Sequence, residues 1–186
     1  AIFVHTGKIT DVFHPGTHEV QTGNTPILSR LANWKFGFES PLRCELWFFS
    51  SSVHIARKWG TSSPVMQAIA SLGTLPLRAF GGYNLRIKDV SKFFLNLVGT
   101  RQTYDLAETD AFIQSQILEL LPPALAVIKE ATELSSKLDE ISERLEDAVN
   151  AKLDKYGIEI VETQVAAVLP PPEVLKAIDE KLAMNI

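Results

Sequence analysis

The sequence predicts a single α+β domain, β-rich over residues 1–88 and mainly helical over residues 89–186. Two observations predict this class. Short apolar and polar alternations, separated by Gly and Pro turns, fill the first half, which is typical of mixed or antiparallel strands. Apolar residues at helical spacing fill the second half, except for one strand-like run near 158–168. This order favours a β-rich half packed on helices over a doubly wound sheet.

The first strands are predicted from two turns. Thr6-Gly7-Lys8 lies between two apolar runs and indicates a hairpin. His14-Pro15-Gly16 indicates a second turn, because Pro presets φ and Gly tolerates positive φ. A third strand is predicted over 17–22, and a short helical turn is predicted to start at Pro26.

Two half-buried strands are predicted next. The segment 42–50 alternates with period two, and its expected apolar face holds Leu42, Cys44, Leu46 and Phe48. The segment 53–61 repeats this pattern, and we expect one face of this strand to hold Val53, Ile55 and Arg57. Residues 62–74 fit either a loop or a short helix.

A long bent strand is predicted over 74–89, in which Gly81-Gly82 marks a bulge or a sharp bend. Asp89 is a good N-cap for a short helix that Gly99 ends. A second helix is predicted over 105–120. Pro122-Pro123 should break or restart it, because neither residue can donate an intrahelical hydrogen bond.

The clearest helix is predicted over 132–156. Its apolar residues fall within an arc of roughly 80° and form one stripe, which consists of Leu134, Leu138, Ile141, Leu145 and Val149. Two ion pairs four residues apart support it, Glu133–Lys137 and Glu140–Arg144. Gly157 should end the helix. A strand over 158–169, prolines at 170–172 and a last helix over 173–184 complete the chain.

The net charge of −4 conceals an asymmetry between the two parts of the chain. Residues 1–101 carry eleven Lys and Arg against five Asp and Glu, a balance of +6. Residues 102–186 carry seven against seventeen, a balance of −10. Such a split can steer head-to-tail association or turn the basic part toward an anionic surface. The same split also arises if exposed helices simply favour Glu.

Cysteine usage and hydropathy place the chain in a reducing compartment. Cys44 is the only cysteine, so it cannot form an internal disulfide, and we expect it to be a small buried residue of a strand. No apolar run approaches the roughly 18 residues of a transmembrane helix, and no signal peptide is evident. Because the sequence opens on Ala1 rather than Met, we expect that it begins inside a longer protein, whose earlier part could carry an anchor.

The histidines do not form a convincing metal site, although there are four of them: His5, His14, His18 and His54. His14 and His18 are four residues apart, but Pro15-Gly16 excludes the helix that would direct both at one ion. The lone cysteine and the lack of an acidic ligand motif point the same way. We expect no metal site.

Motifs of catalysis are also missing from the sequence. There is neither a Gly-Lys-Ser/Thr phosphate loop nor a GxSxG elbow, and "GGYNLRI" favours a bend over a cofactor cradle. The acidic residues over 130–147 are interpreted as a solvated helix face. We therefore predict no catalytic residue, no cofactor and no small-molecule substrate.

Five residues are candidates for a contact surface. Arg57, Lys58 and Trp59 form a basic and aromatic cluster. Other cations could extend it toward nucleic acid, namely Arg78, Arg86, Lys88 and Lys92. A pI of about 5.6 and the lack of a recognition helix argue against that partner. Trp47 and Phe49, with Phe48 between them, could reach a membrane or a neighbour if exposed, although a core strand is favoured.

Segments along the whole chain resemble one family. The opening "AIFVHTGKITDVFHPGTHEV" has a Gly-Lys hairpin followed by a Pro-Gly turn. From Leu145, "NAKLDKYGIEIVETQVAAVLPPPEVLKAIDEKL" reads as a long helix, "YGI", a strand, a proline and a helix. This order resembles the SPFH/band 7 family of stomatin, prohibitin and flotillin. "KWGT" at 58–61 and "RAFGGYNLRIKDVSKFFLNLVGT" at 78–100 are similar to its bacterial branch often labelled virion-core-like.

The resemblance implies a non-enzymatic scaffold that packs side by side at a membrane and gathers or regulates partner proteins. We therefore expect a homo-oligomer in the full-length protein, cytoplasmic and peripheral to the inner face of a membrane, without nucleic acid. The family usually continues into a coiled-coil helix, without which this chain should self-associate only weakly. Because the +6 and −10 parts favour a head-to-tail contact, that association should depend on salt. The alternatives are a structural component of a phage-like particle, a nucleic-acid-binding module, and a hydrolase with an unrecognised site.

Overall fold

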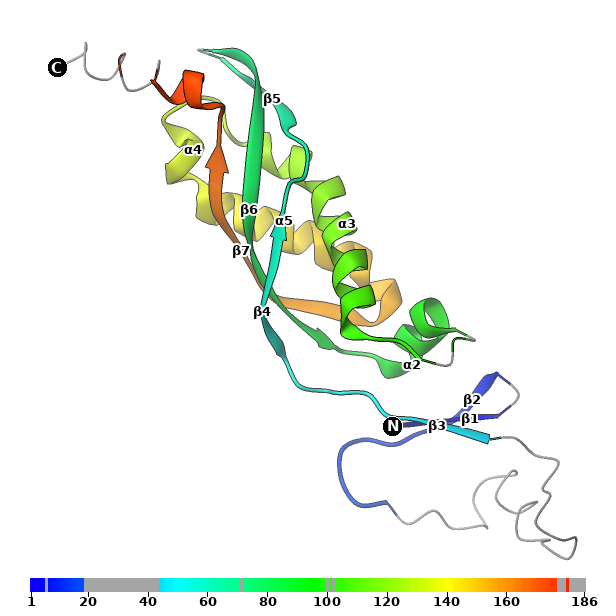
Figure 1. Cartoon of the computed structure of the whole chain (residues 1–186). Helices are drawn as coiled ribbons and strands as arrows, with labels where there is room; N and C mark the ends of the chain where they lie inside the picture. The colour runs from blue at the N-terminus through cyan, green and yellow to red at the C-terminus, as the bar shows by residue number, and fades with distance from the viewer. Residues whose placement is uncertain are drawn as a thin grey trace, which may run out of the picture.

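The computed structural model describes residues 1–176 and 180, except residues 6, 19–43, 71, 100 and 102. It has a small N-terminal sheet, a long twisted sheet, and helices on one face of the long sheet (Figure 1). This arrangement confirms the α+β prediction. The strand predicted over 17–22 falls mostly outside the described residues, as do the helical turn at Pro26, Leu42, the side chain of Cys44 and most of the last helix.

The N-terminal sheet has the strand order β2-β1-β3, and both pairings are antiparallel. Strands β1 (Ile2–His5) and β2 (Lys8–Val12) form the predicted hairpin. Strand β3 (Cys44–Trp47) pairs with the other side of β1. Figure 1 places this sheet at the end of the molecule next to α2 (Val90–Phe93).

The apolar face predicted for β3 is wrong, because the opposite face packs against the protein. Leu46 and Phe48 are 50% and 78% exposed, whereas Trp47 and Phe49 are half-buried against the core. Both faces of this segment carry apolar residues, so tertiary contacts decide which is covered. The rings of Trp47 and Phe94 meet edge-to-face at 5.4 Å, a favoured geometry for aromatic pairs.

The long sheet is built around β6 (Gly73–Ile87), the predicted long strand. Strands β4 (His54–Gly60) and β5 (Val65–Ile69) pair with successive parts of β6, and β7 (Ile158–Leu169) pairs along residues 78–87. All these pairings are antiparallel. The presence of β5 shows that neither a loop nor a short helix describes 62–74.

Strand β4 departs from the regular alternation predicted for it. The pairing with β6 shifts register between His54 and Arg57, and Ala56 has a φ of +57°. The amide of Ala56 donates to Asn84 Oδ1 at 2.9 Å, which holds this bulge. Because a bulge redirects the side chains beside it, Ile55 is 69% exposed instead of sharing a buried face.

Side-chain caps start two of the helices, and the cap predicted at Asp89 is confirmed. Asp89 accepts a hydrogen bond from the Lys92 amide at 3.0 Å and starts α2 (Val90–Phe93), which continues as a π-helical turn (Phe94–Val98). Asp105 caps α3 (Leu106–Leu125) in the same way, through the Glu108 amide at 2.9 Å. Side-chain acceptors of this kind satisfy amides that the first turn leaves unpaired.

Helix α3 does not break at Pro122-Pro123, contrary to the prediction. Both prolines lie in its last turn, so any bend that they cause displaces only the few residues that follow them. Leu121 and Leu125 on either side of them are fully buried. Packing therefore maintains the helix to its end at Leu125.

The predicted helix over 132–156 is present but interrupted at Lys137, between α4 (Glu133–Ser136) and α5 (Leu138–Leu153). A short 3-10 turn (Asp154–Tyr156) follows α5. The predicted stripe is confirmed as part of the core between helices and sheet, with Leu138 half-buried. Both predicted ion pairs form, at 3.0 Å and 2.9 Å.

Glu133 makes stability depend on pH at the start of α4. Its Oε2 accepts from the Lys129 amide at 2.6 Å and the Glu130 amide at 3.1 Å, and Oε1 pairs with Lys137. The Lys129 amide, and then Lys137, lower the pKa of Glu133 from 4.5 to about 2. A carboxyl group whose pKa is lower in the folded state than in the unfolded state stabilises the fold when the pH is above the unfolded-state pKa. This contribution is lost as the pH falls through the folded-state pKa.

We therefore expect Glu133→Gln to lower the urea midpoint at pH 6, and the difference from wild type to shrink between pH 4.5 and pH 2. The exposed Glu143→Gln on α5 is the control and should change little. A difference that stays constant across this pH range would contradict the role given to Glu133.

Candidate functional site

The structure does not bring the five candidate contact residues onto one surface. Trp47 and Phe49 lie half-buried beside α2, and Trp59 is 3% exposed within the core. Arg57 is bound to Asp110, and Lys58 is exposed on β4. The five side chains thus lie in different layers of the fold and do not share one surface.

Aromatic rings pack the N-terminal sheet against α2 and the π-helical turn that follows it. Phe49 meets Phe93 edge-to-face at 5.8 Å and Phe94 at 6.5 Å. Phe93 in turn meets Tyr104 at 5.4 Å. Edge-to-face pairs add to the energy of burial, so this cluster fixes where the N-terminal sheet lies.

Arg57, Asp110 and Tyr83 form a network between the sheet and α3. Arg57 Nε donates to Asp110 Oδ1 at 3.0 Å and forms an ion pair with the same carboxylate. The Tyr83 hydroxyl also donates to Asp110 Oδ1, at 2.8 Å. Burial raises the pKa of Tyr83 to about 12, against the lowering effect of Arg57. The hydroxyl therefore stays protonated, and Asp110 is fully engaged in holding α3 to the sheet.

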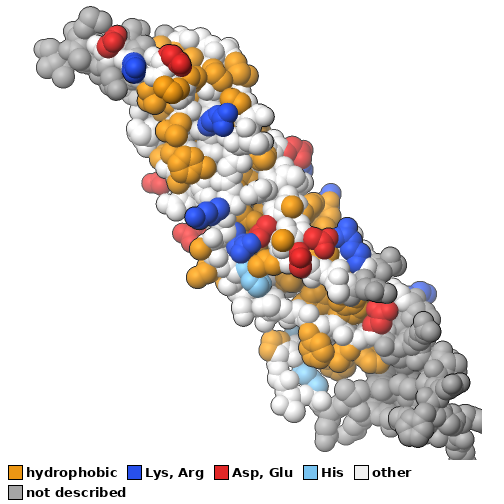
Figure 2. Space-filling model, viewed as in Figure 1, with side chains coloured by type: hydrophobic (Ala, Val, Ile, Leu, Met, Phe, Trp, Pro, Cys, Tyr) orange, Lys and Arg blue, Asp and Glu red, His pale blue; other side chains and the backbone are white. Residues whose placement is uncertain are grey.

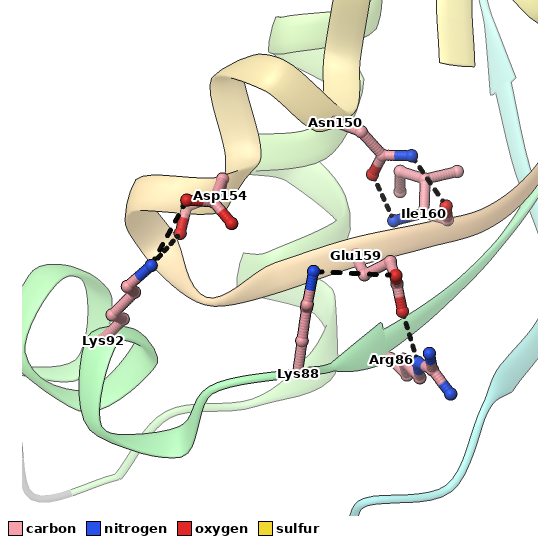
Figure 3. Close-up of polar contacts among 7 residues, drawn as sticks. All are labelled: Arg86, Lys88, Lys92, Asn150, Asp154, Glu159 and Ile160. Atoms are coloured by element: carbon pink, nitrogen blue, oxygen red, sulfur yellow. Dashed lines mark hydrogen bonds and ion pairs between the residues drawn. The ribbon is translucent and has the colours of Figure 1, made fainter. Parts of the chain in front are cut away.

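Three further cations of the basic part, Arg86, Lys88 and Lys92, pair with carboxylates of the acidic part (Figure 3). Arg86 binds Glu159 on β7, and Lys88 Nζ lies 4.0 Å from the same carboxylate. Lys92 Nζ lies 3.2 Å from Asp154 after α5. The charge split along the sequence is thus partly neutralised inside the fold. These residues do not form an unpaired basic surface for nucleic acid.

Two of the four histidines lie near each other on the surface. His18 Nε2 is 2.6 Å from the carbonyl oxygen of His14, both exposed in the turn after β2. His54 lies on β4, and His5 is placed only by its backbone in β1. Within the described residues, no three His, Cys, Asp or Glu side chains gather as metal ligands. The lack of a metal site stays a prediction.

A groove of about 1020 Å³ separates the N-terminal sheet from the start of α2. The N-terminal segments that line it contribute three exposed apolar side chains, Val12, Leu46 and Phe48, beside polar residues such as the serines at 50–52. Residues 87–92 also line it and contribute Lys88 and Lys92. This groove is the candidate site, since it combines exposed apolar groups with cations at one end of the molecule.

The outer face of the long sheet carries a second set of exposed apolar residues. Met66, Phe80 and Leu169 are between 44% and 60% exposed. Figure 2 shows hydrophobic side chains toward both ends of the molecule in this view, with acidic and basic side chains between them. No helix among the described residues is long and apolar enough to cross a membrane.

Sequence reasoning missed Phe48 as an outward residue. A signal for it was present, because Trp47, Phe48 and Phe49 follow one another and a strand alternates its side chains. At least one aromatic ring of such a run must therefore point away from the face that is covered. Which ring points outward depends on the positions of Phe93 and Phe94, which contact Trp47 and Phe49.

Two comparisons with known proteins bear on this chain. A sequence model of the family described as "SPFH domain-Band 7 family" matches residues 1–186. The chain is also 25% identical over 181 residues to "Uncharacterized protein YdjI" of Bacillus subtilis (strain 168). That match covers 94% of this chain and 54% of the other protein, so the chain spans about half the length of this curated relative.

Proposed function

The chain belongs to the SPFH domain-Band 7 family, and on this premise we propose that it is a non-enzymatic scaffold domain that self-associates and organises or recruits partner proteins at a membrane. Members of this family are generally membrane-associated scaffolds. The proposal places the domain in the cytoplasm, peripheral to the inner face of a membrane. It also assigns the chain to the bacterial virion-core-like branch, on the residues 58–61 and 78–100.

The groove beside the N-terminal sheet is the observation that supports membrane contact. Phe48, at 78% exposure, and Leu46 project from one end of the molecule, next to Val12. Apolar side chains beside cations fit the boundary between lipid head groups and acyl chains. Lys88 and Lys92 already lie near carboxylates. We therefore expect the apolar side chains to contribute more to binding than net charge does.

The test is binding to vesicles of phosphatidylcholine with phosphatidylglycerol, measured by flotation. We expect Leu46→Ser/Phe48→Ser to weaken partition on the order of tenfold, since burial of large apolar side chains in lipid is lost. Binding of the wild-type chain should fall little with added salt, because screening acts mainly on exposed charges.

Met66→Ser is the matched control, because Met66 is 60% exposed on β5, away from the groove. It should leave flotation unchanged, and both variants should keep the wild-type melting temperature. Equal flotation of the double variant and wild type would exclude the groove as the membrane contact. Binding that 0.5 M salt abolishes would show a purely electrostatic contact instead.

A further inference from the structure

Strand β7 has one edge that no described strand occupies, since β6 pairs with its other edge. An unpaired edge presents backbone amides and carbonyls that can add a strand from another molecule. Helix α5 lies along this edge, and its side chains hydrogen-bond to some of these amides and carbonyls. These contacts determine whether a strand from another molecule can pair with the edge.

Three polar side chains of α5 hydrogen-bond to the backbone of β7. Ser142 Oγ accepts from the Val165 amide at 2.9 Å, and Glu146 Oε2 accepts from the Thr163 amide at 2.8 Å. Asn150 binds Ile160 twice (Figure 3): Oδ1 accepts from its amide at 2.8 Å, and Nδ2 donates to its carbonyl at 2.9 Å.

The spacing of these side chains matches the repeat of a strand. Ser142, Glu146 and Asn150 are each four residues apart, which is about 6 Å along a helix. Two residues of a strand span about 6.6 Å, so the step from Val165 to Thr163 fits one helix step. The next contact is three residues on, at Ile160, where the pairing of β7 with β6 shifts register and accommodates one extra residue.

This polar row lies beside the apolar stripe on the same helix. Ile141, Leu145 and Val149 are each one residue before a member of the row, and all three are fully buried. One row of α5 thus packs on the core, and the next row binds the edge of β7. Ser142 also donates to the Leu138 carbonyl at 2.7 Å, so its hydroxyl is used both as donor and as acceptor.

We propose that Ser142, Glu146 and Asn150 act as a latch, through which α5 takes the place of a neighbouring strand and keeps β7 from pairing with the β7 edge of a second copy. Two such edges could pair antiparallel about a two-fold axis. A second copy fits the edge because that pairing would cover Val161 and Leu169, both 44% exposed on β7. The latch directs self-association to other surfaces, and it does not depend on membrane contact.

The experiment compares the chain with Glu146→Ala/Asn150→Ala, which removes three of the four bonds. Glu143→Ala/Asp147→Ala is the control, because both residues are exposed on the same helix. Hydrogen exchange and light scattering across a concentration series are measured on both. In Glu146→Ala/Asn150→Ala at low protein concentration, we expect the Ile160 and Thr163 amides to exchange at least about tenfold faster than in wild type. As the concentration of this variant rises, we expect dimers or larger species to form.

The control should stay like wild type in both measurements. A folded latch variant that remains a monomer, or whose two amides exchange as in wild type, would overturn the proposal. If the double variant does not fold, Glu146→Gln and Glu146→Leu decide. Gln keeps a side-chain oxygen acceptor for the Thr163 amide and should preserve its protection, whereas Leu should lose it and self-associate. Equal behaviour of these two variants would also overturn the proposal.

Discussion

Replacement of Gly157 by Ala is expected to cost about 3–5 kcal/mol, among the largest effects of a single substitution in this protein. Gly157 ends the helical segment with a φ of +69°, a conformation that L side chains rarely adopt. An added Cβ would lie 2.1 Å from the carbonyl oxygen of Asp89. The chain cannot easily move away, because the Gly157 carbonyl accepts from the Lys88 amide at 2.8 Å and the Asp89 amide at 3.1 Å.

Gly73→Ala separates strain from collision. Gly73 has a similar φ of +76°, but an added Cβ would meet nothing within 4 Å. It should therefore cost only about 1–2 kcal/mol, the strain of a positive φ in an L residue. Urea denaturation of both variants gives the difference. Equal losses would show that the approach of Asp89 to Gly157 is not tight.

Leu145→Ala should destabilise the protein by about 2–5 kcal/mol, the usual range for emptying a buried leucine site. Leu145 is 0% exposed, in the middle of the α5 stripe that packs on the core. The loss combines the transfer of the side chain with the cavity left behind, because the helix is held on both sides and cannot close the gap.

Leu95→Ala is the matched control, since Leu95 is 59% exposed in the π-helical turn after α2. Its cost should stay below about 1 kcal/mol. Calorimetry or urea titration measures both variants. A loss at Leu145 no larger than that at Leu95 would mean that α5 does not cover the sheet as described.

Elements with strong local signals could be predicted from the sequence. The α5 stripe repeats over several turns, so one face had to be apolar whatever its partner. Gly157 after a helix and Asp89 before one reflect chemistry that acts within a few residues. The family resemblance, which extends along the whole chain, is also confirmed.

Other features depended on contacts between distant segments. The 42–50 segment has apolar residues on both faces, and only Phe93 and Phe94 select Trp47 and Phe49 for burial. The bulge of β4 rests on the Asn84 side chain, which is 28 residues from Ala56. Local alternation cannot indicate such a partner.

The candidate surface could be predicted only in part for the same reason. Lys58 is exposed as a contact residue requires, but Arg57 is occupied by Asp110 from α3. Glu146 was included in a solvated acidic face, yet it binds the backbone of β7. Each of these pairings joins residues from opposite halves of the chain or from different layers, and no spacing along the sequence encodes it.

Fractionation of cells that express the protein tests the scaffold proposal most directly. The protein should sediment with membranes and stay there in a moderate salt wash, and cross-linking of the membrane fraction should give species larger than a monomer. Leu46→Ser/Phe48→Ser should shift part of it to the supernatant. Recovery of the wild-type protein entirely in the supernatant, or in dense phage-like particles free of lipid, would contradict a membrane-associated scaffold.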